Sequence, residues 1–136
     1  MSRDSKVVLT TMVMVYRDDG SFLVEKRLKN DWPGLNFPGG HVEDDESVEE
    51  CAIRETYEET GLTLEDAEQV GTIEWNLPQE KTRHFCVLFR SKHFSGSIKA
   101  SNEGPIFWIR KEELSEHPLS LDFDKVFAIA SKGLNL

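Results

Sequence analysis

The sequence predicts an α+β fold, a mixed α/β sandwich in which a β-sheet is packed between helices. Segments rich in β-branched and apolar residues stand on both sides of one strongly capped central helix, and an amphipathic helix follows near the end of the chain. The predicted helices are too few to alternate with the strands, which argues against regular βαβ winding. At 136 residues, we expect a single domain over residues 1–136.

Two strands are expected before the central helix. Val7–Tyr16 is β-branched and apolar, which predicts a buried strand. Asp18–Gly20 is typical of a hairpin turn, so Phe22–Arg27 is expected to be the partner strand. Asn30–Leu35, which contains a tryptophan and a proline, is expected to form a loop.

The central helix has defined ends. Ser47 followed by Glu50 forms a capping box, and Gly61 suits the left-handed residue that ends a helix. These signals predict a helix over Val48–Thr60.

The second half of the chain has further strand segments and two helical ones. A turn of helix is expected at Lys111–Leu114, and Leu121–Ser131 has the apolar spacing of an amphipathic terminal helix. The segments with strand character are Val70–Trp75, Arg83–Ser91, Phe94–Ile98 and Ile106–Arg110.

Three glutamates of the predicted helix lie on one side of it. At about 100° per residue, Glu55, Glu58 and Glu59 continue the arc that begins with Val48 and Cys51. Like charges three and four residues apart repel one another unless a counter-charge is present. A solvated acidic face is the common alternative, but it does not explain this clustering. Since Mg²⁺ bridges carboxylates to substrate phosphates, the arc predicts a site for Mg²⁺, with Mn²⁺ as a substitute.

The segment Phe37–Gly40, with the sequence Phe-Pro-Gly-Gly, leads toward this helix. Two glycines allow close backbone approach, so that a main-chain carbonyl or N–H could reach a metal or a phosphate. We interpret this turn as the front half of the same site.

The residues from Gly40 to Leu62, GHVEDDESVEECAIRETYEETGL, fit the spacing G-x5-E-x7-R-E-U-x-E-E-x-G-U, in which U is bulky or apolar. Thr56 is a weak fit to the first U. The segment resembles the signature of the Nudix (MutT-type) hydrolases. This resemblance implies the Nudix fold, a mixed β-sheet packed between helices, and cleavage of a nucleoside diphosphate linked to another group.

The resemblance also implies a set of metal ligands. They are the main-chain carbonyl of Gly39 and the carboxylates of Glu55, Glu58 and Glu59. Glu103 occupies the place of a further acidic metal ligand in MutT-like members, although a loop carboxylate in a polar turn is the alternative.

Two catalytic roles follow from the same resemblance. Glu46 and Arg54 are expected to form an ion pair that braces the loop against the helix. Glu55 is the nominated general base that takes the proton of the attacking water, with Glu103 as the alternative.

Two fragments outside the signature bear on the substrate. WPGLNFPGGHVEDDES, and SGSIKASNEG followed by a tryptophan, are similar to MutT-type enzymes that remove pyrophosphate from oxidised purine nucleoside triphosphates such as 8-oxo-dGTP. The resemblance therefore implies a nucleoside triphosphate as substrate, a nucleoside monophosphate and pyrophosphate as products, and a role in nucleotide pool sanitation and DNA repair.

Candidate substrate-binding residues flank the signature. Arg27 matches a basic residue that touches phosphates in relatives, and Lys26 replaces it if the strand register differs by one. Trp32 is a candidate for the rim of the pocket, since an aromatic ring can stack on a purine. Gly40 allows the backbone to approach the phosphates.

The region before the terminal helix is the candidate for reading the base. In the MutT-type pattern an asparagine near that helix does so, whereas this chain has Ser120, Asp122 and Asp124 there. Asp122 and Asp124 are therefore candidates for contact with an 8-oxopurine edge.

Two alternative functions stay open. The first is an enzyme of the same fold that acts on ADP-ribose, a dinucleoside polyphosphate or another capped nucleotide, and Pro78 lies near a position where the ADP-ribose branch carries a proline. The second is a non-catalytic nucleotide-sensing module. Such a module is expected to lose one of the paired glutamates, and this segment retains them.

Composition restricts the partners. The formal net charge of −9 argues against broad binding to nucleic-acid polymers or anionic membranes. No apolar run approaches a membrane span, and the N-terminal residues lack the apolar core of a signal peptide. Cys51 and Cys86 form no metal-like or redox pair. We therefore expect a cytoplasmic monomer or homodimer whose partner is a small nucleotide.

Overall fold

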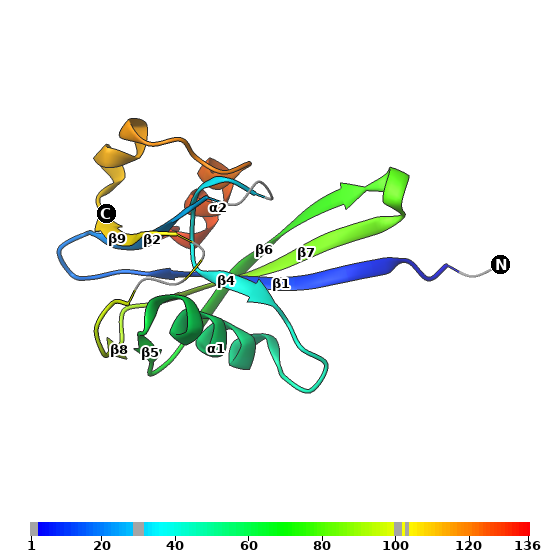
Figure 1. Ribbon diagram of the computed structural model, residues 1–136, viewed down its shortest axis with the longest axis horizontal. Coiled ribbons are helices and arrows are strands. Elements are labelled where there is room, and N and C mark those ends of the chain that lie inside the picture. The colour runs from blue at the N-terminus through cyan, green and yellow to red at the C-terminus, as the bar shows by residue number, and fades with distance from the viewer. Residues whose placement is uncertain (1–2, 29–31, 100–101, 103) are drawn as a thin grey trace.

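The computed structural model describes residues 3–28, 32–99, 102 and 104–136. Within these residues the strands form three sheets (Figure 1). The first sheet has the order β4 (Gly39–His41), β1 (Lys6–Val15), β7 (Thr82–Ser91) and β6 (Glu68–Leu77). The second has the order β3 (Gly34–Asn36), β2 (Phe22–Arg27) and β9 (Ile106–Ile109), and in the third β5 (Thr63–Leu64) pairs with β8 (Phe94–Ser95).

The helices lie against the first sheet. In that sheet β1 is parallel to β7 and antiparallel to β4, so the sheet is mixed. Figure 1 shows α1 (Val48–Thr60) and α2 (Phe123–Ala130) on opposite sides of it. Two short 3₁₀ helices, η1 (Pro78–Glu80) and η2 (Lys111–Glu116), complete the described elements. The predicted mixed sandwich with a sheet between helices is confirmed.

Alternating side chains of β1 supply both faces of the core. Val13 and Val15 pack in the cluster on the α1 side, which includes Ala52, whereas Met14 packs in the cluster that includes Phe123 of α2. Successive residues of a strand point to opposite faces, and here both faces are covered. This arrangement explains why the first strand has a nearly continuous apolar sequence.

The central helix has the predicted bounds and caps. The Ser47 hydroxyl accepts a hydrogen bond from the Glu50 N–H at 3.1 Å, and the Glu50 carboxylate accepts one from the Ser47 N–H at 2.9 Å. Gly61 ends the helix with a φ of 84°. Local chemistry at the two ends therefore determines the length of α1.

Two short strands lie in segments that the sequence assigns to turns. β3 begins inside the predicted loop Asn30–Leu35, of which residues 30 and 31 lie outside the described residues. β4 begins inside the turn Phe37–Gly40 and pairs with β1 at Thr11 and Met12. The loop prediction is therefore wrong from Gly34 onward. Glycine and proline indicate turns in a sequence, but a glycine also permits the closest pairing of two backbones.

The segment before α2 lies on β3. The N–H of Leu35 donates to the carbonyl of Pro118 at 3.0 Å, and the N–H of Ser120 donates to the carbonyl of Leu35 at 3.2 Å. A Cβ added at Gly34 would lie 2.8 Å from the carbonyl carbon of Leu119. Only a glycine fits here, so this segment and β3 are held in direct backbone contact.

No helix in the described part of the chain has the length and apolar character needed to cross a membrane.

Candidate active site

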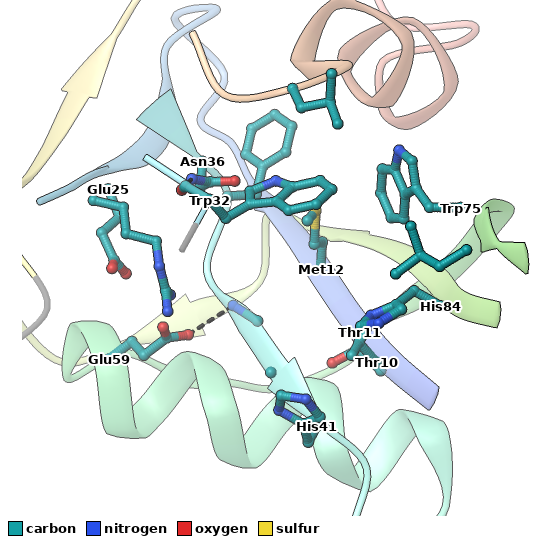
Figure 2. A pocket seen from close by; sticks show the side chains of 16 residues that line it. Thr10, Thr11, Met12, Glu25, Trp32, Asn36, His41, Glu59, Trp75 and His84 are labelled. Atoms are coloured by element: carbon teal, nitrogen blue, oxygen red, sulfur yellow. Dashed lines mark hydrogen bonds between the residues drawn. The ribbon is translucent and has the colours of Figure 1, made fainter. Parts of the chain in front are cut away.

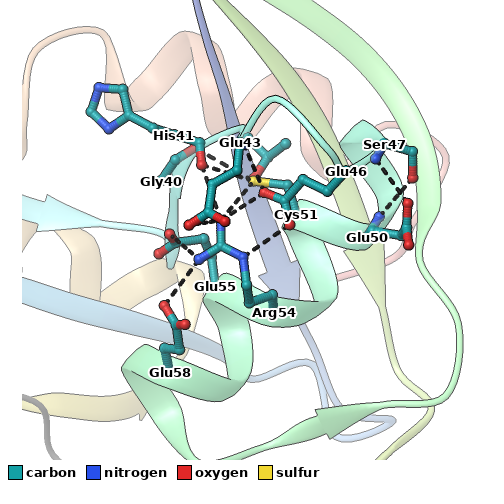
Figure 3. A network of polar contacts seen from close by, with 11 residues as sticks. Gly40, His41, Glu43, Glu46, Ser47, Glu50, Cys51, Arg54, Glu55 and Glu58 are labelled. Atoms are coloured by element: carbon teal, nitrogen blue, oxygen red, sulfur yellow. Dashed lines mark hydrogen bonds and ion pairs between the residues drawn. The ribbon is translucent and has the colours of Figure 1, made fainter.

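Arg54 of α1 is the centre of a cluster of acidic side chains (Figure 3). Its Nε and Nη2 donate to the two carboxylate oxygens of Glu46 at 2.9 and 2.7 Å, which is a bidentate ion pair. Its Nη1 donates to Glu55 at 2.9 Å and to Glu58 at 3.1 Å. The predicted pairing of Glu46 with Arg54 is confirmed, and the same guanidinium also holds two of the predicted metal ligands.

Arg54 also binds the strand that precedes the helix. Its Nη2 donates to the carbonyl of His41 in β4 at 3.1 Å, and the carboxylate of Glu43 lies 3.8 Å away. A planar guanidinium with several donors can join a loop, a strand and a helix in this way. Arg54 therefore braces β4 against α1, as the resemblance implied.

Electrostatics favour the charged forms of this pair. Hydrogen bonds from Arg54, together with one from the Glu43 N–H, lower the pKa of Glu46 to about 2. Hydrogen bonding to Glu46 raises the pKa of Arg54 further above its usual range. Glu46 and Arg54 are therefore both ionised in the folded protein at neutral pH.

The depressed pKa of Glu46 predicts how stability depends on pH. The carboxylate has a lower pKa in the folded state than its ordinary value of 4.5, so its contribution is present above 4.5 and is lost as the pH falls toward about 2. The difference in unfolding free energy between the parent and Glu46→Gln should therefore be largest near neutral pH and shrink through this range. Chemical denaturation of both proteins across this pH range measures it. A difference that does not change with pH would count against the ion pair.

The glycine turn contacts two glutamates of α1. The N–H of Gly39 donates to Oε2 of Glu59 at 2.6 Å, and Glu59 is only 7% exposed. A Cβ added at Gly40 would lie 2.4 Å from the carboxyl carbon of Glu55. The turn and the helix thus form one site, and the absence of a side chain at Gly40 makes room for a carboxylate.

The three glutamates differ in their surroundings. The side chain of Glu55 is 17% exposed and that of Glu58 is 54% exposed, so the predicted arc is buried at Glu59 and open at Glu58. Among the described residues, no three His, Cys, Asp or Glu side chains are grouped as metal ligands. The hydrogen bonds explain this arrangement, because Arg54 holds Glu55 and Glu58 while Gly39 holds Glu59. Glu103 lies outside the described residues.

The donor chemistry nevertheless fits a divalent cation. The carboxyl group of Glu55 lies against Gly40, in the space that a Cβ there would fill, and the carboxylate of Glu59 is hydrogen-bonded to the neighbouring Gly39. Hard cations such as Mg²⁺ and Mn²⁺ take oxygen ligands of this kind. Gly39, Glu55, Glu58 and Glu59 are therefore the described residues that could hold one.

A cavity of about 410 Å³ opens beside the glycine turn (Figure 2). One end is polar and includes Gly39, Gly40 and the buried Glu59. The other end is aromatic, where the rings of Trp32 and Trp75 meet edge to face with their centroids 4.9 Å apart. A molecule with a charged end and a planar aromatic end matches this shape.

Some of the predicted substrate-binding residues line this cavity. They are Arg27, Trp32 and Gly40. Lys26, the alternative to Arg27, is exposed and does not line the cavity. Of the two candidates, Arg27 is therefore the one on the cavity side of β2.

The predicted base-reading aspartates lie elsewhere. Asp122 does not line the cavity, and its Oδ2 accepts a hydrogen bond from Nε1 of Trp75 at 2.8 Å. Asp124 is exposed and is also not a lining residue. The residue of this segment that lines the cavity is Leu121.

Sequence reasoning missed several buried polar residues of the cavity, among them a carboxylate and an amide. Glu25 is 2% exposed and Asn36 is 6% exposed, and both line the cavity. The signal for Glu25 is that it directly follows three apolar residues of the predicted strand and lies on the same face as Arg27. Asn36 has no such signal, because only the tertiary structure buries its amide.

Asn36 shapes the aromatic end of the cavity. Its Nδ2 donates to the carbonyl of Trp32 at 3.0 Å and to that of Gly34 at 3.2 Å. Trp32 has a φ of 65°, which is a costly conformation for a bulky residue. The Asn36 amide therefore stabilises the backbone conformation of Trp32, whose side chain lines the cavity.

Cys51 lies under the site but has a packing role. Its Sγ is 3.3 Å from Oγ1 of Thr11, and the residue is fully buried. Burial raises the pKa of this thiol to about 11, so it is protonated at neutral pH. Cys51 and Cys86 are both free, as predicted.

Comparison with known proteins places this geometry in context. A family model described as NUDIX domain matches residues 6–128. A MutT-like protein of Streptomyces ambofaciens is 35% identical over 106 residues, which are 76% of this chain and 64% of that protein. Phosphatase NudJ of Escherichia coli O1:K1 / APEC is 35% identical over 79 residues, which are 58% of this chain and 51% of NudJ. The chain thus spans less than two thirds of the length of either relative.

A solved structure shares the fold. The crystal structure of a MutT NUDIX hydrolase from Burkholderia pseudomallei aligns with a TM-score of 0.80 at 22% identity. The alignment covers 91% of this chain and 98% of that one.

Proposed function

This chain belongs to the Nudix family, and from that premise we propose that it is a divalent-metal-dependent hydrolase that cleaves a phosphoanhydride bond of a nucleotide. The proposed substrate is a nucleoside triphosphate with an oxidised purine, such as 8-oxo-dGTP, and the products are a nucleoside monophosphate and pyrophosphate. One observation carries this proposal. A single cavity joins the glutamate and glycine site at one end to an aromatic end formed by Trp32 and Trp75.

The glutamate end is suited to phosphates. Gly39 and the side chains of Glu55, Glu58 and Glu59 would hold Mg²⁺, with Mn²⁺ as a substitute, and Glu103 is proposed as a further ligand. Such an ion, when bound, neutralises phosphate charge and lowers the pKa of an attacking water.

The residues of the chain divide the remaining work. Arg54 holds the carboxylate of Glu55 beside Gly40, and Glu55 is the proposed base that accepts the proton of the attacking water. Attack at the second phosphorus breaks its bond to the oxygen of the first phosphate, and the nucleoside monophosphate leaves. Arg27, which lines the cavity, is proposed to bind the substrate's phosphates.

The aromatic end is suited to a base. The rings of Trp32 and Trp75 offer planar surfaces and edges to a purine. The buried amide of Asn36 adds polar groups to the same part of the cavity. These features support a nucleotide over a simple polyphosphate. The formal charge of −9 supports a small-molecule substrate over a nucleic-acid polymer, and we also propose a cytoplasmic monomer or homodimer.

A substrate panel tests the proposal. Purified protein with Mg²⁺ should be assayed with 8-oxo-dGTP, dGTP, other nucleoside triphosphates, ADP-ribose and a dinucleoside polyphosphate. We expect the highest kcat/KM for 8-oxo-dGTP, release of pyrophosphate, and loss of turnover when the metal is chelated. In ¹⁸O-labelled water the label should enter pyrophosphate and not the monophosphate.

The same panel separates the alternatives. A preference for ADP-ribose or a capped nucleotide would replace the proposed substrate with that of another Nudix enzyme. Turnover of none of these compounds would favour a non-catalytic nucleotide-sensing module.

A further inference from the structure

A hydrogen bond ties one wall of the cavity to the terminal helix. Nε1 of Trp75, in β6, donates to Oδ2 of Asp122, the residue that precedes α2, at 2.8 Å. The Trp75 ring lines the cavity and meets Trp32 edge-to-face at an interplanar angle of 76° (Figure 2). The orientation of this wall therefore depends on a carboxylate that is distant in sequence.

The segment that carries Asp122 is itself fixed. Backbone hydrogen bonds join Leu35 of β3 to Pro118 and Ser120, and Gly34 leaves no space between the two backbones. Asp122 then adopts a φ of 60°, a left-handed conformation that aspartate tolerates better than most residues. The acceptor thus has a defined position relative to the cavity.

The geometry argues against direct contact of Asp122 with a base. Its Oδ2 accepts the indole N–H, Lys125 lies 3.6 Å from its Oδ1, and the residue does not line the cavity. Trp75, in contrast, is a lining residue. Any influence of Asp122 on base binding would therefore pass through Trp75.

We propose that Trp75 is a specificity-determining residue for the base of the nucleotide, and that Asp122 is a positioning residue that orients its ring. The inference rests on the proposed function, since it places the base at the aromatic end of the cavity. Its test uses binding of a nucleoside monophosphate, the proposed class of product, and not turnover, so that failure of the inference can be told from failure of the proposed function.

The experiment measures calorimetric affinity, with Mg²⁺ present, for guanosine monophosphate and for ribose 5-phosphate, which lacks the base. Trp75→Phe keeps a ring but removes the indole N–H. Asp122→Gly removes the carboxylate without the strain that another side chain would meet at this φ. Asp122→Asn keeps an acceptor oxygen for the indole N–H. Glu74→Gln is the matched control, because Glu74 is next to Trp75 in sequence but is exposed and does not line the cavity.

We expect the parent to bind guanosine monophosphate more tightly than ribose 5-phosphate. Trp75→Phe and Asp122→Gly should each weaken guanosine monophosphate binding by about three- to tenfold, and the double variant should be no weaker than the weaker single one. Asp122→Asn and Glu74→Gln should stay within about twofold of the parent. None of the variants should alter ribose 5-phosphate binding.

Several results would overturn the inference. If the parent bound guanosine monophosphate and ribose 5-phosphate with equal affinity, the base would not bind at the aromatic end. If the losses of affinity for guanosine monophosphate multiplied in the double variant, Asp122 would act on the base independently of Trp75. The same would follow if Asp122→Asn bound guanosine monophosphate as weakly as Asp122→Gly. A loss shared by both probes would indicate a general structural effect, as would unfolding detected by circular dichroism in Asp122→Gly together with a parent-like Trp75→Phe.

Discussion

Replacing Glu59 by glutamine is expected to reduce kcat at least about a hundredfold while the protein remains folded. Glu59 is buried, lines the cavity and accepts the Gly39 N–H at 2.6 Å. Glutamine keeps an oxygen that can accept this hydrogen bond, so the turn should stay in place. It loses the negative charge that a metal ligand at this position provides. Steady-state kinetics with the best substrate of the panel measures the loss.

A second readout and a control make this prediction specific. Titration with Mn²⁺ should show weaker metal binding by Glu59→Gln than by the parent. Glu49→Gln, an exposed change in the first turn of the same helix, should leave both rate and metal binding unchanged. A rate for Glu59→Gln within threefold of the parent would rule out a direct role in metal binding.

Replacing Arg54 by alanine is expected to lower both stability and rate. The guanidinium hydrogen-bonds to Glu46, Glu55 and Glu58 and to the carbonyl of His41. Without it, like charges face one another and an ion pair with little exposure loses its cation. We expect the melting temperature to fall by at least about 5 °C. We also expect kcat/KM to fall by at least about tenfold, because Glu55 loses the group that holds it beside Gly40.

Scanning calorimetry and kinetics on the same preparations measure these two effects. Arg83→Ala is the matched control, because Arg83 makes an exposed contact with Glu74 at 3.7 Å. Exposed pairs contribute little, so this control should melt within about 2 °C of the parent. Equal melting temperatures for Arg54→Ala and the parent would show that Arg54 does not brace the loop.

Arg54 connects folding and function in one residue. It binds Glu46 of the loop and the His41 carbonyl of β4, which holds both against α1, and it also binds two glutamates of the proposed metal site. A change here therefore alters the scaffold and the site together. Glu59 differs, because its contact with Gly39 can be kept while its charge is removed. The two variants thus separate bracing from metal binding.

The sequence was a reliable guide where the cause is local. The bounds of α1 follow from Ser47, Glu50 and Gly61, which lie next to the turns that they cap. The burial of Glu59 and the partial burial of Glu55 follow from the angular spacing of residues along one helix. The pairing of Glu46 with Arg54 came from a resemblance over the same short segment, and the structure confirms it.

The sequence was a poor guide where distant segments meet. The strand pairing of Gly39 with Met12 depends on a close backbone approach that composition describes only as a turn. No sequence pattern marks Asn36 as a site residue, and it lines the cavity only because β3 lies beside it. Asp122 was expected to contact the base, and its hydrogen bond to Trp75 can be seen only once β6 and α2 are placed side by side.

The sequence by itself therefore determined the mixed sandwich, the capped central helix and the arc of glutamates opposite a glycine turn. These features arise from helical periodicity, capping and alternation, which act over a few neighbouring residues. Only the tertiary structure decided the shape of the cavity, its aromatic end and the partner of Asp122. Those features need contacts between residues that are far apart in the chain, and the packing of the whole domain sets such contacts.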